Sequence, residues 1–202
     1  MRLIIGLGNP GEEYKNTRHN AGFLAIAKLQ NCEIANFSDW KLEKRLKSEI
    51  SKGEIDGEKI ILAKPQTFMN NSGQAVKLLI KQYSLSERSE SKGLRQAQAI
   101  SLNNLWVIHD DLDLPLGTIK ISFAASSAGH HGVESIINSL GAKDFWRLRI
   151  GIGPKIGAGE KFVLKPFKKT EQSLLNETLD QAAAALLLAL KDPKKAMSEY
   201  NK

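Results

Sequence analysis

Short apolar runs alternate along the chain with longer segments in which apolar residues recur at helical spacing. Runs of apolar side chains predict buried strands at residues 3–7, 105–108, 118–123 and 146–152. A hairpin is predicted between residues 46 and 63, because an alternating run ends at Asp56-Gly57 and an apolar return strand follows at 60–63. Helical spacing predicts helices at 21–29, 72–83, 133–140 and 174–190, and it allows a short one within 194–202.

This succession of strands and helices predicts an α/β fold, in which a mixed twisted sheet has helices on both faces. At roughly 150 residues per domain, residues 1–202 are expected to form a single domain. Residues 86–101 interrupt the pattern, since they hold four serines, five charges and no aromatic residue. They are interpreted as a flexible insertion. A basic C-terminal tail is expected from about residue 191.

The charge balance favours a polyanionic partner such as nucleic acid. Lys and Arg number 29 against 22 Asp and Glu, which leaves a net charge of +7. The longest apolar run, residues 182–190, is far shorter than the roughly 20 residues of a membrane span. Cys32 is the only cysteine, which excludes an intrachain disulfide, and the first residues carry no secretory signal pattern. We therefore expect a cytoplasmic protein with no membrane partner.

Residues 6–11, GLGNPG, match the G-x-G-x-x-G pattern of dinucleotide-binding loops after a strand. That function requires a helix to open directly at the third glycine, so that its N–H groups meet the pyrophosphate. Here the helical pattern begins only near Ala21, and no second strand precedes Glu33, where the ribose-binding acid is expected. A tight Gly/Pro loop is the alternative, although it does not account for Asn9.

Two further motifs lie close to predicted helix starts. Residues 17–22, TRHNAG, place His19 there, and an imidazole with a pKa near 6.5 can accept a proton from water. A lone histidine is more often a surface or core residue than a catalytic one. In residues 68–73, FMNNSG, Asn71 or Ser72 fits a helix N-cap, which leaves Asn70 for a ligand.

Carboxylates and histidines gather in two more motifs. Residues 109–115, HDDLDLP, have the donors for a divalent cation, but one aspartate could instead orient a histidine, or the run could be a polar turn. Residues 129–132, GHHG, also suggest a metal site. Neighbouring side chains of an extended segment point apart, however, so a loop with exposed N–H groups fits equally well.

The placement of these motifs is more informative than any one of them. Asn9, Asn70 and Asp110 each follow a predicted strand, and ligands of open α/β sheets bind at the carboxyl ends of strands. One cleft is expected to collect them with His19, beside the 129–132 turn. The motifs contain neither a G-x-S-x-G elbow nor a cysteine, which disfavours a covalent nucleophile. A histidine base, an aspartate and amides suit direct attack of water on a carbonyl.

Four motifs in this order resemble the bacterial peptidyl-tRNA hydrolase family: GLGNPGEEYKNTRHNAG, TFMNNSG, VIHDDLDLPLG and RLRIGIG. The resemblance runs from Met1 to about Lys195, apart from the insertion. It implies a monomeric single α/β domain that needs no cofactor or metal. It also implies hydrolysis of the ester between a nascent peptide and the 3′-terminal ribose of tRNA. Peptidyl-tRNA is then the partner, and no DNA partner is expected.

The resemblance also assigns roles at the catalytic centre. His19 corresponds to the base that activates water, and Asp110 to the residue that orients and polarises it. Asn9 and Asn70 correspond to side chains that place the peptide, the water and the histidine.

Other positions correspond to residues that bind the substrate. Tyr14 and Phe68 resemble aromatic residues that line the cleft near the ester, and Lys120 and Arg149 match basic positions that clamp the 5′ phosphate of the tRNA. Four more lysines are either a solvated loop or further phosphate contacts: Lys161, Lys165, Lys168 and Lys169.

The chain departs from the family pattern in two places. The family has Gly-His-Asn-Gly where this chain has Gly-His-His-Gly, so His131 replaces an asparagine that contacts the substrate main chain. A neutral imidazole ring cannot offer both hydrogen-bonding faces of an amide to one partner. Ser122 stands where the family has a second lysine.

Two other functions compete with ester hydrolysis. A non-catalytic RNA-binding protein could use the same fold, but the presence of His19, Asp110, Asn9 and Asn70 argues against it. A nucleotide-binding oxidoreductase is disfavoured by the position of the first helix start.

Overall fold

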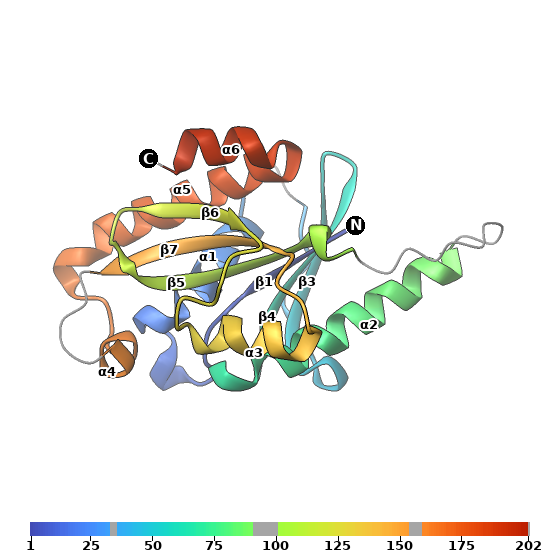
Figure 1. The fold of residues 1–202 in the computed structure, drawn as a ribbon, viewed down its shortest axis with the longest axis horizontal. Coiled ribbons are helices and arrows are strands. Elements are labelled where there is room, and N and C mark those ends of the chain that lie inside the picture. Colours follow the sequence, from blue (N-terminus) through green and yellow to red (C-terminus); the bar gives the residue numbers. More distant parts are fainter. Residues whose placement is uncertain (33–35, 91–100, 154–158, 202) are drawn as a thin grey trace.

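The fold is built around one seven-stranded sheet that is flanked by helices (Figure 1). The computed structural model describes residues 1–32, 36–90, 101–153 and 159–201. The sheet order is β2-β3-β4-β1-β5-β7-β6. The strands are β1 (Arg2–Gly6), β2 (Lys41–Glu43), β3 (Ser48–Ile55), β4 (Glu58–Pro65), β5 (Leu105–Pro115), β6 (Ile119–Phe123) and β7 (Trp146–Gly153). Strands β4, β1, β5 and β7 run parallel, whereas β3, β2 and β6 pair antiparallel, so the predicted mixed sheet is confirmed.

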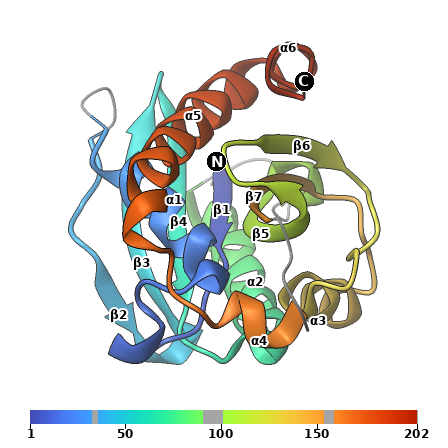
Figure 2. The ribbon, with the colours of Figure 1, turned by 90° about the vertical axis from the view of Figure 1, so that its left-hand side faces the viewer.

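Helices cover both faces of the sheet, as predicted. Helices α1 and α5 lie on one face and α2 and α3 on the other, and the two views in Figures 1 and 2 show this layering. The helices are α1 (Ala21–Gln30), α2 (Ser72–Glu90), α3 (His131–Leu140), α4 (Gly159–Val163), α5 (Gln172–Lys191) and α6 (Pro193–Tyr200).

The central strands have an apolar side chain at nearly every position because both faces are buried. In β1, Ile4 packs in the core beneath α1 and α5, while Leu3 and Ile5 pack in the core beneath α2 and α3. In β5 the same alternation places Trp106 in the first core and Val107 in the second. A strand that is covered on both sides therefore has a continuous apolar run, which is why these strands were predictable.

The structure corrects several predicted boundaries. Strand β2 was not predicted, since all three of its side chains are exposed and no apolar pattern marks it. Helix α4 was also missed. Helix α2 continues to Glu90, so the first residues of the proposed 86–101 insertion belong to this helix, and residues 91–100 lie outside the described residues.

Strand β5 is longer than the apolar run that predicted it. It continues to Pro115 because it pairs with β7 as far as Asp111 and again at Pro115. The polar motif 109–115 is therefore part of a strand, and the turn expected with it begins only at its end, where the Thr118 amide donates to the Pro115 carbonyl at 3.2 Å.

The C-terminal residues form a helix that is fastened to the edge of the sheet. The Asn201 side chain accepts a hydrogen bond from the amide of Ile121 at 2.6 Å and donates one to its carbonyl at 2.8 Å. Asn201 thus pairs the backbone groups of one residue of β6, the edge strand. Among the described residues, no helix is both long enough and apolar enough to cross a bilayer.

Helix α1 approaches the sheet closely through a glycine. A Cβ atom at Gly22 would overlap the carbonyl oxygen of Ile108 and backbone atoms of Leu7. The Phe23 amide donates to the Leu7 carbonyl at 3.2 Å, which holds the helix in this position. The close approach brings the residues just before α1, including His19, against the ends of β1 and β5.

We predict that Gly22→Ala lowers the free energy of unfolding by about 3 kcal/mol, at the upper end of typical overpacking costs, because rigid backbone must move. Gly57→Ala serves as the control, since Gly57 has φ 78° and open space around it. It should cost only about 1 kcal/mol of backbone strain. Urea unfolding of both variants measures the difference, and equal losses would contradict the close-packing argument.

Candidate active site

A cavity of about 380 Å³ opens at the carboxyl ends of the central strands. Strand β5 contributes His109 and the carboxylates that follow it to the lining, and the loop before α3 forms a second side. Helix α4 forms a third side through Gly159, Glu160 and Val163. His19 and Asp110 both line this cavity, so the structure brings together the two residues predicted to be catalytic.

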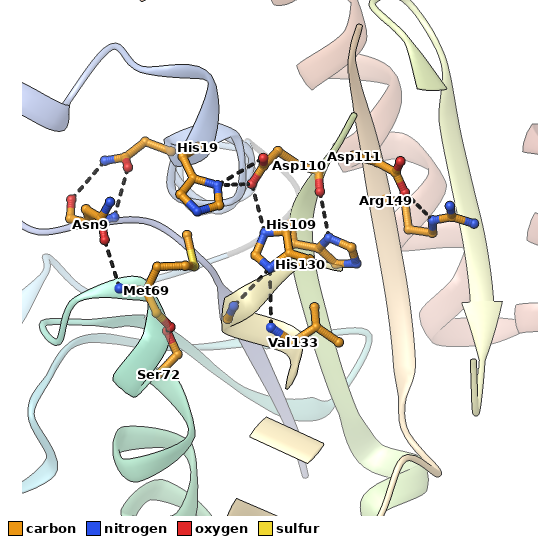
Figure 3. A network of polar contacts seen from close by, with 12 residues as sticks. Asn9, His19, Met69, Ser72, His109, Asp110, Asp111, His130, Val133 and Arg149 are labelled. Atoms are coloured by element: carbon orange, nitrogen blue, oxygen red, sulfur yellow. Dashed lines mark hydrogen bonds and ion pairs between the residues drawn. The ribbon is translucent and has the colours of Figure 1, made fainter. Parts of the chain in front are cut away.

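His19 and Asp110 form a direct hydrogen-bonded pair. The Nδ1 atom of His19 lies 2.9 and 3.0 Å from the two Asp110 carboxylate oxygens, as Figure 3 shows. A carboxylate only accepts, so Nδ1 carries the proton and Nε2 carries the lone pair. The His19 ring is nearly buried, with 11% of its side chain exposed. It is therefore oriented as a base whose free nitrogen faces away from Asp110.

Asp110 has a second imidazole partner that the sequence did not identify. The Nε2 atom of His130 lies 2.9 Å from an Asp110 oxygen. The Nδ1 atom of His130 accepts hydrogen bonds from the amides of Gly132 and Val133 at 3.1 and 3.3 Å, which caps α3. Because Nδ1 accepts, Nε2 must carry the ring proton that it donates to Asp110. His131 has other neighbours, Glu134 and Glu160, so the two adjacent histidines have different partners.

Two histidines keep Asp110 ionised although it is buried. Burial alone would raise the pKa of this carboxyl, but attraction to His19 and His130 and their hydrogen bonds lower it far below the usual value. His109 is also buried at this site, and its Nδ1 donates to the Asp110 backbone carbonyl at 2.7 Å. Burial lowers the pKa of His109 well below its usual value, and His130 adds to the effect.

The same three side chains, His19, Asp110 and His130, lie close enough to be considered as a metal site. The hydrogen bonds oppose this use. To ligate an ion, His130 would need a lone pair on Nε2, so its proton would have to move to Nδ1. There it would face the N–H groups of Gly132 and Val133, and both hydrogen bonds would be lost. The geometry suits a carboxylate that orients two imidazoles better than a metal centre.

Asn9 is held at the end of β1 by its neighbours. The Asn9 backbone N–H donates to the Asn20 side-chain oxygen at 2.9 Å, and the Asn9 backbone carbonyl accepts from the Asn20 side-chain nitrogen at 3.0 Å. The Met69 amide donates to the Asn9 side-chain oxygen at 2.8 Å. Asn20 was not singled out from the sequence, although it lies in the same motif as His19.

The two aromatic residues predicted to line the cleft are in contact with each other. The rings of Tyr14 and Phe68 meet edge to face with their centroids 6.4 Å apart, and Phe68 is 56% exposed. Asn70 follows in a 3₁₀ turn that spans Met69–Asn71, and its side chain is exposed. Because the Met69 amide binds Asn9, this turn lies beside the end of β1.

The two predicted phosphate-binding residues lie opposite each other on neighbouring strands. Lys120 of β6 pairs in register with Arg149 of β7. Lys120 is exposed, whereas Arg149 is partly covered and its Nε donates to Asp111 at 2.5 Å. Asp111 is the residue after Asp110, so Arg149 adjoins β5 close to the His19–Asp110 pair.

His131, the residue that departs from the family pattern, is the first residue of α3 and is 58% exposed at its side chain. Its ring nitrogens lie 3.9 Å from Glu134 and 3.8 Å from Glu160 of α4. His131 therefore lies at the edge of the cavity rather than among the residues around Asp110.

The loop before α3 is held by a buried arginine. Arg147 donates to the carbonyl oxygens of Ala125 and Ser126, and burial lowers its pKa to about 10. Within this loop Ala128 adopts a φ of 48°, a conformation that favours glycine. An alanine therefore occupies this left-handed position in a loop that keeps the His130 contact with Asp110.

Taken together, these features define an α/β protein in which a buried imidazole–carboxylate pair lines a cavity at the carboxyl ends of the central parallel strands. The sequence profile of the peptidyl-tRNA hydrolase family matches residues 3–202. The chain therefore belongs to the peptidyl-tRNA hydrolase family, whose members act on an ester bond.

Individual relatives agree over the whole chain. The peptidyl-tRNA hydrolase of Carboxydothermus hydrogenoformans is 43% identical over 100% of this chain and 99% of its own. That of Aquifex aeolicus is 41% identical over 100% and 97%. The crystal structure of peptidyl-tRNA hydrolase from Acinetobacter baumannii, 33% identical, superposes with a TM-score of 0.83 and covers 100% of this chain and 94% of that one.

We predict that Asp110→Asn flattens the acid dependence of stability. The unfolded carboxyl takes up a proton near pH 4. The native carboxyl has a lowered pKa and does not, so its stabilisation is complete above about pH 4 and is lost as the pH falls further. Below pH 4 the wild type should lose up to about 1.4 kcal/mol per pH unit more than the variant.

Urea unfolding at several pH values measures these slopes. Asp180→Asn is the control, since Asp180 forms an exposed ion pair with Lys28, and it should retain the wild-type slope. Equal slopes in Asp110→Asn and the wild type would show that Asp110 is not held ionised in the native protein.

Proposed function

We propose that the protein hydrolyses the ester that joins a nascent peptide to the 3′-terminal ribose of tRNA, and so releases peptide and free tRNA. The observation that carries this proposal is the His19 imidazole, held by Asp110 in a cavity of a chain that belongs to the peptidyl-tRNA hydrolase family. The proposal includes a monomer that acts in the cytoplasm on peptidyl-tRNA without a cofactor.

In the proposed reaction, Nε2 of His19 takes a proton from water while the water oxygen attacks the ester carbonyl. The negative charge of Asp110 stabilises the imidazolium that forms, through the Nδ1 hydrogen bond. The tetrahedral intermediate then collapses, the C–O bond to the ribose breaks, and the ribose oxygen takes the proton from His19. His130 keeps Asp110 oriented throughout.

Substrate placement is assigned to the asparagines and the aromatic pair. The Asn9 side-chain oxygen already accepts from the Met69 amide, which leaves its amide nitrogen to donate to a peptide carbonyl. Asn70, Tyr14 and Phe68 form the adjoining surface for the peptide. His131, at the edge of the cavity, is proposed to contact the substrate main chain through one ring nitrogen.

The tRNA phosphates are assigned to Lys120 and Arg149, which the β6–β7 register places side by side. These contacts are electrostatic and sequence-independent. Lys161, Lys165, Lys168 and Lys169 are exposed on the segment that includes α4, where they could extend the basic surface.

We predict that purified protein releases peptide from peptidyl-tRNA at the same rate with and without a chelator. His19→Ala should lose nearly all activity while its circular dichroism and melting temperature stay close to those of the wild type. A positioned base typically contributes a factor of about 10²–10⁴.

Each contrary outcome points to a different function. Wild-type turnover in His19→Ala would remove the general-base assignment. Loss of activity with the chelator would restore the metal alternative, and binding of peptidyl-tRNA without release would favour the non-catalytic RNA-binding function.

We predict that Lys120→Ala raises the KM for peptidyl-tRNA several-fold, with little change in kcat, because it removes a phosphate contact and not a reacting group. It should reduce the slope of log KM against log salt by about one. Lys143→Ala is the control, since Lys143 is exposed in the turn before β7 and lies outside the predicted phosphate site. An unchanged salt slope in Lys120→Ala would remove it from the tRNA surface.

A further inference from the structure

The residue before His19 is the most heavily engaged cation among the described residues. Arg18 is 3% exposed, and its guanidinium lies between two aromatic rings, 4.6 Å from the Phe162 centroid and 4.8 Å from that of Phe167. It donates through Nη2 to both Glu171 carboxylate oxygens at 2.6 and 2.9 Å, and through Nη1 to the Ile152 carbonyl at 3.4 Å. The reaction proposed above makes no use of this cation.

The partners of Arg18 belong to the segment that walls the cavity. Phe162 is a residue of α4, which lines the cavity through Gly159, Glu160 and Val163. The backbone joins the same two segments: the Arg18 amide donates to the Lys165 carbonyl at 3.1 Å, and Thr17 forms a β-bridge with Pro166. Residues 16–18 and 159–171 are thus connected by backbone, aromatic and ionic contacts.

Glu171 is itself fixed by local structure. Its carboxylate accepts from the Lys168 amide at 2.7 Å, in a capping box at the turn before α5. Burial would raise the pKa of Glu171, but the bonds from Lys168 and Arg18 outweigh this and lower it. The carboxylate is therefore a fixed anchor for the guanidinium, not a mobile surface group.

We propose that Arg18 is a positioning residue for the hydrolysis: it holds the turn that contains His19 against the 159–171 wall and so keeps the imidazole aligned with Asp110. This inference rests on the proposed function for its kinetic consequence. Arg18 and His19 are consecutive in one 3₁₀ turn, so a shift of the guanidinium displaces the imidazole. A displacement of about 1 Å costs up to about 10²-fold in rate.

An arginine suits this place better than a lysine. Its planar guanidinium stacks on two rings while Nη2 donates to the Glu171 carboxylate and Nη1 to the Ile152 carbonyl, an arrangement that the single nitrogen of an ammonium group cannot reproduce. Arg18→Lys keeps the charge and loses this geometry. Glu171→Gln keeps the shape of the anchor and removes its charge, so it tests the same contact where the lysine variant fails to fold.

The experiment compares both variants with Glu58→Gln. Glu58 pairs with Arg2 at 2.8 Å across the amino ends of β1 and β4, an ion pair of the same chemistry that is remote from His19. We expect kcat for peptidyl-tRNA to fall about tenfold in Glu171→Gln and further in Arg18→Lys, with KM within about twofold of the wild type. Glu58→Gln should retain the wild-type kcat.

A spectroscopic measurement separates positioning from stability. The NMR signal of the His19 Nδ1 proton, hydrogen-bonded to Asp110, should shift and broaden in Arg18→Lys and Glu171→Gln and stay unchanged in Glu58→Gln. In Arg18→Ala, added methylguanidinium should restore part of kcat by occupying the space between Phe162 and Phe167, and methylammonium should not.

Unchanged kcat and an unchanged His19 signal in folded Glu171→Gln would overturn the proposal, even if its melting temperature fell. An equal loss of kcat in Glu58→Gln would overturn it as well, because the effect would then follow from general destabilisation. If the wild type released no peptide from peptidyl-tRNA, the proposed function would fail, yet the NMR comparison would still decide whether Arg18 positions His19.

Discussion

A buried carboxylate organises the site. Asp110 lies almost without solvent just after the apolar run of β5, and an ionised group there is stable only if hydrogen bonds replace the lost water. Two imidazole donors supply them, His19 from the turn before α1 and His130 from the cap of α3. These elements lie on opposite faces of the sheet, so the position of one carboxylate depends on both cores being correctly packed.

The turn before α1 connects this carboxylate to the rest of the protein. Three consecutive side chains leave it in different directions: Arg18 to Glu171, His19 to Asp110, and Asn20 to the backbone of Asn9. Glu171, Asp110 and Asn9 lie in three different parts of the chain, so the turn is held from three sides. A base benefits from being held in this way. The entropy cost of orienting its side chain is met when the protein folds and does not add to the barrier of each reaction.

The sequence predicts the central strands well and the site only in part. Strands buried on both faces have apolar runs that are readable locally, whereas β2 is exposed and leaves no such signal. Pairing across long separations has no local signature: Arg18 and Glu171 are 153 residues apart, and nothing in either segment identifies the other. His130 was considered only with its neighbour as a metal ligand, because its partner, Asp110, becomes apparent only when β5 and α3 are placed together.

The distribution of charge bears on how a polyanion could use this site. The chain has a net charge of +7, yet the cavity is lined by Asp110, Asp111, Asp113 and Glu160. A phosphate would be repelled from that lining, whereas an uncharged ester and its peptide would not. The charge of Arg149 neutralises that of Asp111 at the border of the cavity, and Lys120 lies beside Arg149 on the next strand. Positive charge therefore begins where the acidic lining ends. This division supports a substrate whose polyanionic body stays outside while its uncharged end reaches His19.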